Sequence, residues 1–282
     1  MKKTGKLLAL LLAFVMVFMT AVPAFAEDDA LKYVVLGDSI GYGAGVLNSE
    51  EACFGKIVAD TAGFEFKNDA VNGYRTEDLI AHLDKDAIKA DVAEADIISI
   101  SIGGNDFLRG DMAGLIAEAN SGDFSRFDEI AVDFYTNFCT IIAKIKTLNP
   151  DAVILVQTLY NPGIEAIKPV YQQGADRLNA GYRRYLAEHK NAYELLEVAD
   201  AFVGHDEYVA IDHIHPSAEG NVVIAGIVLK ELNSLGLTDK TEPVVNNEGI
   251  DQAEIISFKF FKYLLKKLFT RVVEFISQLF NK

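Results

Sequence analysis

The chain has 282 residues, a formal net charge of −15 at pH 7 and a hydrophobic fraction of 50%. So acidic a protein is a poor binder of nucleic acid, because contact with phosphates needs a surface rich in lysine and arginine. The length is ample for one domain with a real hydrophobic core.

The first 26 residues, 1–26, have the order of parts found in a secretory signal peptide. Lysines near the start precede an apolar run over residues 7–22, and Ala24 and Ala26 provide the small residues of a cleavage site. A retained membrane anchor is the competing interpretation, but the polar sequence that begins at Glu27 favours cleavage. We therefore predict a secreted, extracellular protein whose mature chain begins near Glu27.

Residues 27–235 alternate short apolar runs with amphipathic stretches. The predicted strands are Tyr33–Leu36, Ile97–Ile102, Val153–Val156 and Leu195–Val198, with a weaker one around Phe64–Phe66. The predicted helices include Glu77–Asp84, Ile130–Leu148 and Asp176–Glu188. Nearly continuous apolar strands that alternate with helices indicate a parallel sheet covered on both faces. The sequence predicts an α/β domain, a three-layer α/β/α sandwich.

Ser39 follows the first predicted strand and lies among glycines. A serine at such a turn can project its hydroxyl, while neighbouring glycines let backbone N–H groups approach a substrate oxygen. A plain turn and a phosphate cradle are the alternatives. The pattern Gly37-x-Ser39-x-Gly41 also matches the nucleophile elbow of α/β-hydrolases, but that fold places several strands before the elbow. Only one predicted strand precedes Ser39, so we reject that fold.

Two further polar turns follow later strands. Gly73 lies beyond the second predicted strand, and Asn105 lies in the Gly-Gly-Asn-Asp sequence that ends the third. If the first and third strands are neighbours, Ser39 and Asn105 converge at their carboxyl ends. The N–H groups of Ser39 and Gly73 and the side-chain amide of Asn105 are then candidates for an oxyanion hole. A capped turn without a catalytic role is the alternative for Gly-Gly-Asn-Asp.

Segment 212–216, Asp-His-Ile-His-Pro, contains the candidate base. His215 has an aspartate three residues before it and a proline directly after it, a spacing that can turn both side chains toward one partner. His213 is adjacent to Asp212, but neighbouring side chains usually diverge. Together with Ser39, the pattern predicts His215 as general base and Asp212 as the carboxylate that orients it. Attack by Ser39 on an acyl carbonyl would form an acyl-serine intermediate.

These segments together resemble the blocks of the SGNH, or GDSL-type, hydrolase family. The blocks are Gly37-Asp38-Ser39, Gly73, Gly104-x-Asp106 around Asn105, and Asp212-x-x-His215-Pro216. The resemblance covers about 31–235 and implies a flavodoxin-like, five-stranded parallel sheet and ester hydrolysis without metal or cofactor. Ile40 replaces the leucine of the family's four-letter name, a change that leaves the chemistry untouched.

The substrate is predicted only as an ester of a lipid, a small acyl group or an acylated glycan. Tyr74 and Arg75 are bulkier than expected after the second block, and either narrow the pocket, meet a polar or anionic substrate, or face solvent. Phe107 opens a long region, 107–133, of the kind that borders the ligand site in this fold class. We therefore expect substrate contacts from Tyr74, Arg75 and Phe107.

The alternative function is a non-catalytic binder of surface glycans or lipids on the same fold. The intact set of Ser39, Asp212 and His215 argues against it, since a binder needs no such set. Cys53 and Cys139 could pair outside the cell or remain buried thiols, and their spacing fits no metal site. We assign no function to them.

Residues 236–254 are polar and contain proline and asparagine, which is typical of a linker. Residues 255–282 carry six basic residues against one acidic residue and predict a cationic amphipathic helix. Its apolar stripe comprises Phe258, Phe261, Leu265, Leu268, Phe269, Val272, Ile276 and Leu279. Such a helix can bind an anionic membrane surface, making the protein peripheral there. Docking onto the protein's own acidic body, or self-association, is the alternative.

Overall fold

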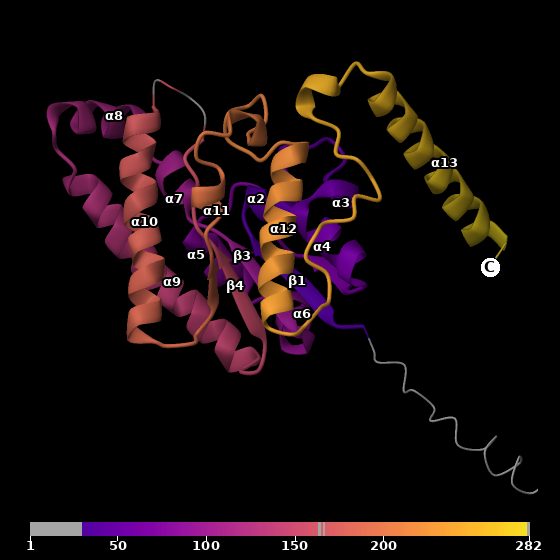
Figure 1. Cartoon of the computed structure of the whole chain (residues 1–282), viewed down its shortest axis with the longest axis horizontal. Helices are drawn as coiled ribbons and strands as arrows, with labels where there is room; N and C mark the ends of the chain where they lie inside the picture. Colours follow the sequence, from indigo (N-terminus) through magenta and orange to yellow (C-terminus); the bar gives the residue numbers. More distant parts are fainter. Residues whose placement is uncertain (1–29, 163–164, 166, 281–282) are drawn as a thin grey trace, which may run out of the picture. The chain divides into compact units, whose positions relative to one another are not determined.

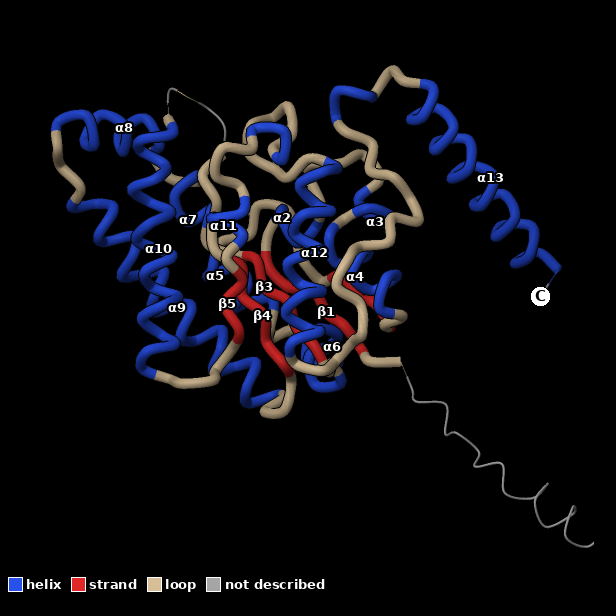
Figure 2. Tube along the Cα trace, in the orientation of Figure 1, coloured by secondary structure: helices blue, strands red, loops and turns tan. Residues whose placement is uncertain are grey.

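A five-stranded, all-parallel sheet lies at the centre of the part of the chain that the structure describes, residues 30–162, 165 and 167–280 of a computed structural model. The strands are β1 (Lys32–Gly37), β2 (Glu65–Asn68), β3 (Ile97–Ser101), β4 (Val153–Gln157) and β5 (Glu194–Leu196). Their order, β2-β1-β3-β4-β5, confirms the flavodoxin-like sheet and makes β1 and β3 neighbours (Figure 2). The predicted signal peptide, 1–26, lies outside the described residues.

Helices cover both faces of the sheet, as predicted (Figure 1). One face packs against α5 (Thr76–His82), α6 (Asp86–Glu94), α9 (Ser125–Leu148) and α10 (Lys168–Glu188). The other packs against α4 (Phe54–Ala62), α11 (Val198–Ala201) and α12 (Ala218–Ser234). Strand β1 is apolar along its length because both of its faces are buried. Val34 and Leu36 lie in the first core, while Tyr33 and Val35 lie in the second.

Shorter helices occupy the loops at the carboxyl ends of the strands. They are α2 (Ser39–Tyr42), α3 (Ser49–Ala52), α7 (Gly104–Leu108), α8 (Met112–Ser121) and the 3₁₀ turns Asp206–Tyr208 and Gln252–Glu254. The long region 107–133 therefore folds as α7, α8 and the beginning of α9. These loops place the glycine-rich and polar turns of the sequence at one edge of the sheet.

The last predicted strand, Leu195–Val198, differs from the structure. Strand β5 ends at Leu196, and Val198 already begins α11. The hydroxyl of Thr158 donates to the Leu196 carbonyl and accepts from the N–H of Ala199, at 3.1 and 2.9 Å. The Thr158 hydroxyl thus stabilises the bend at which the chain leaves the sheet, between β5 and α11.

The two cysteines do not form a disulfide. Cys53 and Cys139 are both free, the first directly before α4 and the second within α9. Because α4 and α9 cover opposite faces of the sheet, the two thiols are kept apart. Of the two interpretations left open by the sequence, free thiols fit the structure.

The segment that the sequence marks as a linker, 236–254, packs onto the domain. Ile250 is only 3% exposed, and Asp251 pairs with Val46 in an isolated antiparallel bridge. The predicted amphipathic helix follows as α13 (Phe258–Phe280), starting three residues later than the predicted tail. Among the residues that the structure describes, no helix combines the length and apolar character needed to cross a membrane.

Candidate active site

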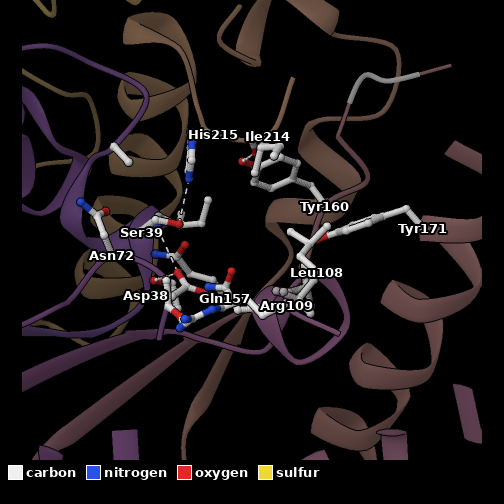
Figure 3. Close-up of a pocket in the computed structure, with 18 of the residues that line it drawn as sticks. Asp38, Ser39, Asn72, Leu108, Arg109, Gln157, Tyr160, Tyr171, Ile214 and His215 are labelled. Atoms are coloured by element: carbon white, nitrogen blue, oxygen red, sulfur yellow. Dashed lines mark hydrogen bonds between the residues drawn. The ribbon is translucent and has the colours of Figure 1, made fainter. Parts of the chain in front are cut away.

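Ser39, Asp212 and His215 meet at the carboxyl edge of the sheet, and Figure 3 shows the contact between His215 and Ser39. His215 Nε2 lies 2.9 Å from Ser39 Oγ, and His215 Nδ1 lies 2.8 Å from Asp212 Oδ2. The imidazole therefore bridges the hydroxyl and the carboxylate. In the tautomer with the proton on Nδ1, Nε2 is free to accept the proton of Ser39.

The turn after β1 fixes the Ser39 side chain. Gly37 has a φ of +121°, and a Cβ there would lie 1.8 Å from the Ser101 carbonyl oxygen, so only glycine fits. Asp38 caps α2 by accepting the N–H of Ile40 at 3.0 Å. Ser39 is consequently the first residue of a helix that starts directly above the strand.

Hydrogen bonds within the Asp212–His215 turn, and one from a residue outside it, hold the turn in place. Asp212 Oδ1 accepts the N–H groups of Ile214 and His215, both at 3.0 Å, which closes the turn on its own side chain. The buried Tyr160, which follows β4, donates its hydroxyl to the Ile214 carbonyl at 2.6 Å. The local sequence thus forms the turn, and β4 fixes its position.

Asp212 is ionised in this setting. Partial burial by itself raises the pKa of a carboxyl group, but hydrogen bonds from the His215 side chain and from the N–H groups of His215 and Ile214 outweigh burial. The pKa of Asp212 is therefore held below its ordinary value. A negative charge beside His215 Nδ1 stabilises the imidazolium that would form during proton transfer.

Ser39, Gly73 and Asn105, the candidates for an oxyanion hole, all line one cavity beside Ser39 Oγ. In the described part of the chain, the backbone N–H groups of Ser39 and Gly73 have no hydrogen-bond acceptor. Asn105 Nδ2 donates one hydrogen to the Tyr74 carbonyl at 3.0 Å, which leaves its second amide hydrogen available. Three donors from three different loops thus border the same space.

The loops that carry Gly73 and Asn105 are tied together. Asp106 accepts the hydroxyl of Thr76 at 2.6 Å and its N–H at 3.2 Å, and Arg109 Nη1 donates to the Gly73 carbonyl at 2.6 Å. These bonds fix the spacing of the two loops. Donors that are held in place before the substrate arrives stabilise developing charge most effectively.

The cavity has a volume of about 590 Å³, within the usual range of small-molecule sites. Its apolar lining consists of Ile40, Ala44, Leu108, Leu159, Tyr160, Tyr171 and Ile214. Besides the catalytic and oxyanion-hole candidates, the polar residues that line it are Asp38, Asn72, Ser101, Arg109, Gln157, Thr158 and Gln252. Gln157, Tyr171 and Gln252 are not among the site residues predicted from the sequence. The position of Gln157 at the end of β4 was a usable signal, whereas Gln252 lies in the segment interpreted as a linker.

Tyr74, Arg75 and Phe107, from which substrate contacts are expected, do not line this cavity. Phe107 is 4% exposed and packs on the ring of Phe127, with 5.6 Å between centroids, so it belongs to the core. The Tyr74 hydroxyl contacts His82 Nδ1 at 3.2 Å, and Arg75 forms an ion pair with Glu77. Both side chains therefore contact residues that do not line the cavity.

No group of three or more histidine, cysteine, aspartate or glutamate side chains is arranged to bind a metal within the described residues. The arrangement that is present can carry out proton transfer and nucleophilic attack. Its parts are a nucleophile, a base, an oriented carboxylate and preorganised N–H donors.

Comparison with known proteins finds the same combination of fold and motifs. The sequence profile of the GDSL-like lipase/acylhydrolase family matches residues 35–223. A curated relative, the spore germination lipase LipC of Bacillus licheniformis, is 27% identical over 207 residues, which are 67% of this chain and 91% of LipC. The family match includes Ser39, Asp212 and His215 but ends before Gln252.

Solved structures share the fold. A lipase from a goat rumen metagenome superposes with a TM-score of 0.58 and 25% identity, over 74% of this chain and 99% of that one. Phospholipase A1 from Streptomyces albidoflavus NA297 shares the fold, with a TM-score of 0.57 and 21% identity, over 73% of this chain and 99% of that one.

Proposed function

This chain belongs to the GDSL-like lipase/acylhydrolase family, and on that premise we propose that it is a secreted serine esterase that cleaves carboxylic esters through an acyl-serine intermediate. The observation that carries the proposal is the continuous contact from Ser39 Oγ through His215 to Asp212. The neighbouring N–H groups without acceptors support it. A protein that only binds its ligand has no use for an oriented base beside a hydroxyl.

In the first half of the reaction, Ser39 Oγ attacks the ester carbonyl carbon while His215 Nε2 takes its proton. The carbonyl oxygen becomes negative and is bound by the N–H groups of Ser39 and Gly73 and the amide of Asn105. Collapse of this intermediate breaks the bond to the alcohol oxygen, and His215 gives its proton to the departing alcohol. The acyl group remains on Ser39.

In the second half, water replaces the alcohol. His215 removes a proton from the water as its oxygen attacks the acyl carbonyl, and the same donors bind the new oxyanion. The bond to Ser39 Oγ then breaks, and the serine recovers its proton from His215. Asp212 stays ionised throughout and holds the imidazole in position.

The cavity favours an acyl chain as the part of the substrate held next to Ser39. Its apolar lining removes hydrocarbon from water, while the polar groups near Ser39 fix the carbonyl. Relatives named as lipases support lipid esters as the substrate class. We include short-chain esters, which the same lining accommodates.

Helix α13 supports a location at a membrane surface. Lys266 and Lys267 on its polar face form ion pairs with Glu51 and Glu50 of the domain, and such contacts are what the alternative, docking onto the protein's own acidic body, requires. The opposite, apolar face remains exposed, with Phe258 81% and Phe269 70% accessible. A large exposed apolar face on a helix that also carries the exposed basic residues Lys262 and Arg271 fits an anionic lipid surface. We therefore include peripheral membrane binding in the proposal.

The test of catalysis uses the chain from residue 27 with p-nitrophenyl butyrate and octanoate. The wild type should turn over at least one ester, Ser39→Ala should lose on the order of 1,000-fold or more in kcat, and the exposed-site control Ser121→Ala should match the wild type. An alkyl fluorophosphonate should label the wild type at one site and leave Ser39→Ala unlabelled. Absence of both turnover and labelling would favour the non-catalytic binder.

A further inference from the structure

Gln252 contacts the carboxylate that orients the base. Its Nε2 lies 3.0 Å from Asp212 Oδ2, the oxygen that also accepts from His215 Nδ1, and 3.1 Å from the Ala44 carbonyl oxygen. An amide nitrogen has two hydrogens, and both have acceptors here. Gln252 thus links Asp212 to the loop that follows Ser39.

With Gln252 included, Asp212 accepts four hydrogen bonds. The N–H groups of Ile214 and His215 reach Oδ1, while His215 Nδ1 and Gln252 Nε2 reach Oδ2. A carboxylate offers about four acceptor positions, so the donor set is complete. The carboxylate then has a single favourable rotation, and Gln252 is the one donor that comes from outside the Asp212–His215 turn.

The segment 248–252, which we call the strap, is fixed independently of Gln252. Asn48 donates to the Glu248 carbonyl at 3.0 Å and accepts the Ile250 N–H at 2.8 Å. The Ile250 carbonyl accepts the N–H of Leu47 at 2.8 Å, and the Ile250 side chain is buried. These bonds hold the strap in place, so the amide of Gln252 is available for a role beyond anchoring it.

From this geometry we propose that Gln252 is a positioning residue for catalysis, which acts through Asp212 to hold the His215 imidazole in line with Ser39 Oγ. The inference rests on the proposed esterase function and adds to it a residue outside the region matched by the family profile, 35–223. It makes the strap a functional part of the active site.

Two substitutions separate positioning from packing. Gln252→Met keeps the length of the side chain but has no N–H donor. Gln252→Glu keeps the shape as well, and its carboxylate accepts rather than donates. Gln172→Met, at an exposed glutamine on α10, is the matched control. The strap keeps its contacts to Asn48, and Gln172 is exposed. We therefore expect all three variants to fold.

The experiment measures kcat, KM, their pH dependence and Tm for these variants with a soluble p-nitrophenyl ester. For Gln252→Met we expect a fall of about 10- to 100-fold in kcat, comparable to the loss of other partners that orient catalytic ligands, with KM changed less than about twofold. In Gln252→Glu the acid limb of kcat/KM should move to higher pH, because the added negative charge favours the protonated Asp212–His215 pair. The control should match the wild type.

Several results would overturn the inference. A Gln252→Met enzyme with wild-type kcat would show that the contact has no catalytic effect. A rise in KM alone would make Gln252 a substrate contact. If kcat falls equally in both Gln252 variants, together with Tm and without a shift of the acid limb, the role of Gln252 is structural. A wild type that hydrolyses no ester would instead refute the proposed function itself, and this inference with it.

Discussion

His215 Nε2 lies 2.9 Å from Ser39 Oγ, although 176 positions separate the two residues in the chain. The sheet creates this contact. Ser39 follows β1, and the Asp212–His215 turn is held by Tyr160, which follows β4, so both are presented at the same carboxyl edge. Parallel strands gather their following loops at one edge, which is why active sites of this architecture lie there.

Replacing Asp212 with asparagine should leave the turn intact but remove most of the activity. The asparagine oxygen can still accept the N–H groups of Ile214 and His215, while its NH₂ group would face His215 Nδ1 and favour the wrong imidazole tautomer. We expect kcat to fall on the order of 10,000-fold in assays at pH 8. The exposed substitution Asp239→Asn is the control. A loss below tenfold would contradict the assigned role of Asp212.

Removing the Asn105 amide should slow the reaction without weakening substrate binding. The oxyanion forms only during the reaction, so Asn105→Ala should lower kcat on the order of 100-fold or more and change KM little. Steady-state kinetics with p-nitrophenyl butyrate measure both constants, and the exposed Asn120→Ala provides the comparison. If KM rises while kcat is retained, Asn105 binds the ground state instead.

Asp38 should make the stability of the protein depend on pH. Burial raises the pKa of its carboxyl to about 7, against opposing hydrogen bonds from the Ile40 N–H and the Ser101 side chain. Because the folded state favours the protonated form, the stability due to Asp38 is greatest below about pH 4 and is lost as the pH rises through 7.

The variant Asp38→Asn should therefore be more stable than the wild type by an amount that grows from pH 4 to pH 8, reaching roughly 1–4 kcal/mol. The asparagine oxygen can still accept the N–H of Ile40. Urea unfolding of both proteins at pH 5 and pH 8 measures the difference. If the difference in free energy of unfolding between the two proteins is the same at both pH values, Asp38 is ionised in the folded protein at both.

The exposed face of α13 should mediate membrane binding. The triple variant Phe261→Ser, Leu265→Ser, Phe269→Ser removes three large apolar side chains, each contributing roughly 1.5–3 kcal/mol on full burial. We expect at least tenfold weaker sedimentation with vesicles containing phosphatidylglycerol, and unchanged hydrolysis of a soluble ester. Serine at Val132 and Val203, which are 64% and 75% exposed elsewhere on the domain, is the control.

Unchanged sedimentation of the triple variant would refute the membrane proposal. Deletion of residues 255–282 extends the same test, because it removes α13 but retains Gln252. Catalysis of a soluble ester that survives this deletion and is lost in Gln252→Met would separate the role of the strap from that of the helix.

The layered fold and the three side chains of the candidate triad follow from the order of residues in the chain. Apolar runs such as Tyr33–Leu36 bury both faces of a strand, so their alternation with amphipathic stretches indicates a covered parallel sheet. The spacing of Asp212 and His215 is a local property, since a four-residue turn brings the two side chains together wherever it is placed. Local geometry of this kind can be derived from the order of residues.

The other side chains that surround Ser39 could not be predicted, because long-range packing places them. Phe107 follows the expected strand, yet it turns into the core because α9 and α10 offer it an apolar site. Gln252 lies in polar sequence without periodicity, yet the path of the strap brings its amide into contact with Asp212. Both outcomes depend on contacts between segments far apart in the chain, and those contacts are set by the packing of the complete domain, which no local pattern encodes.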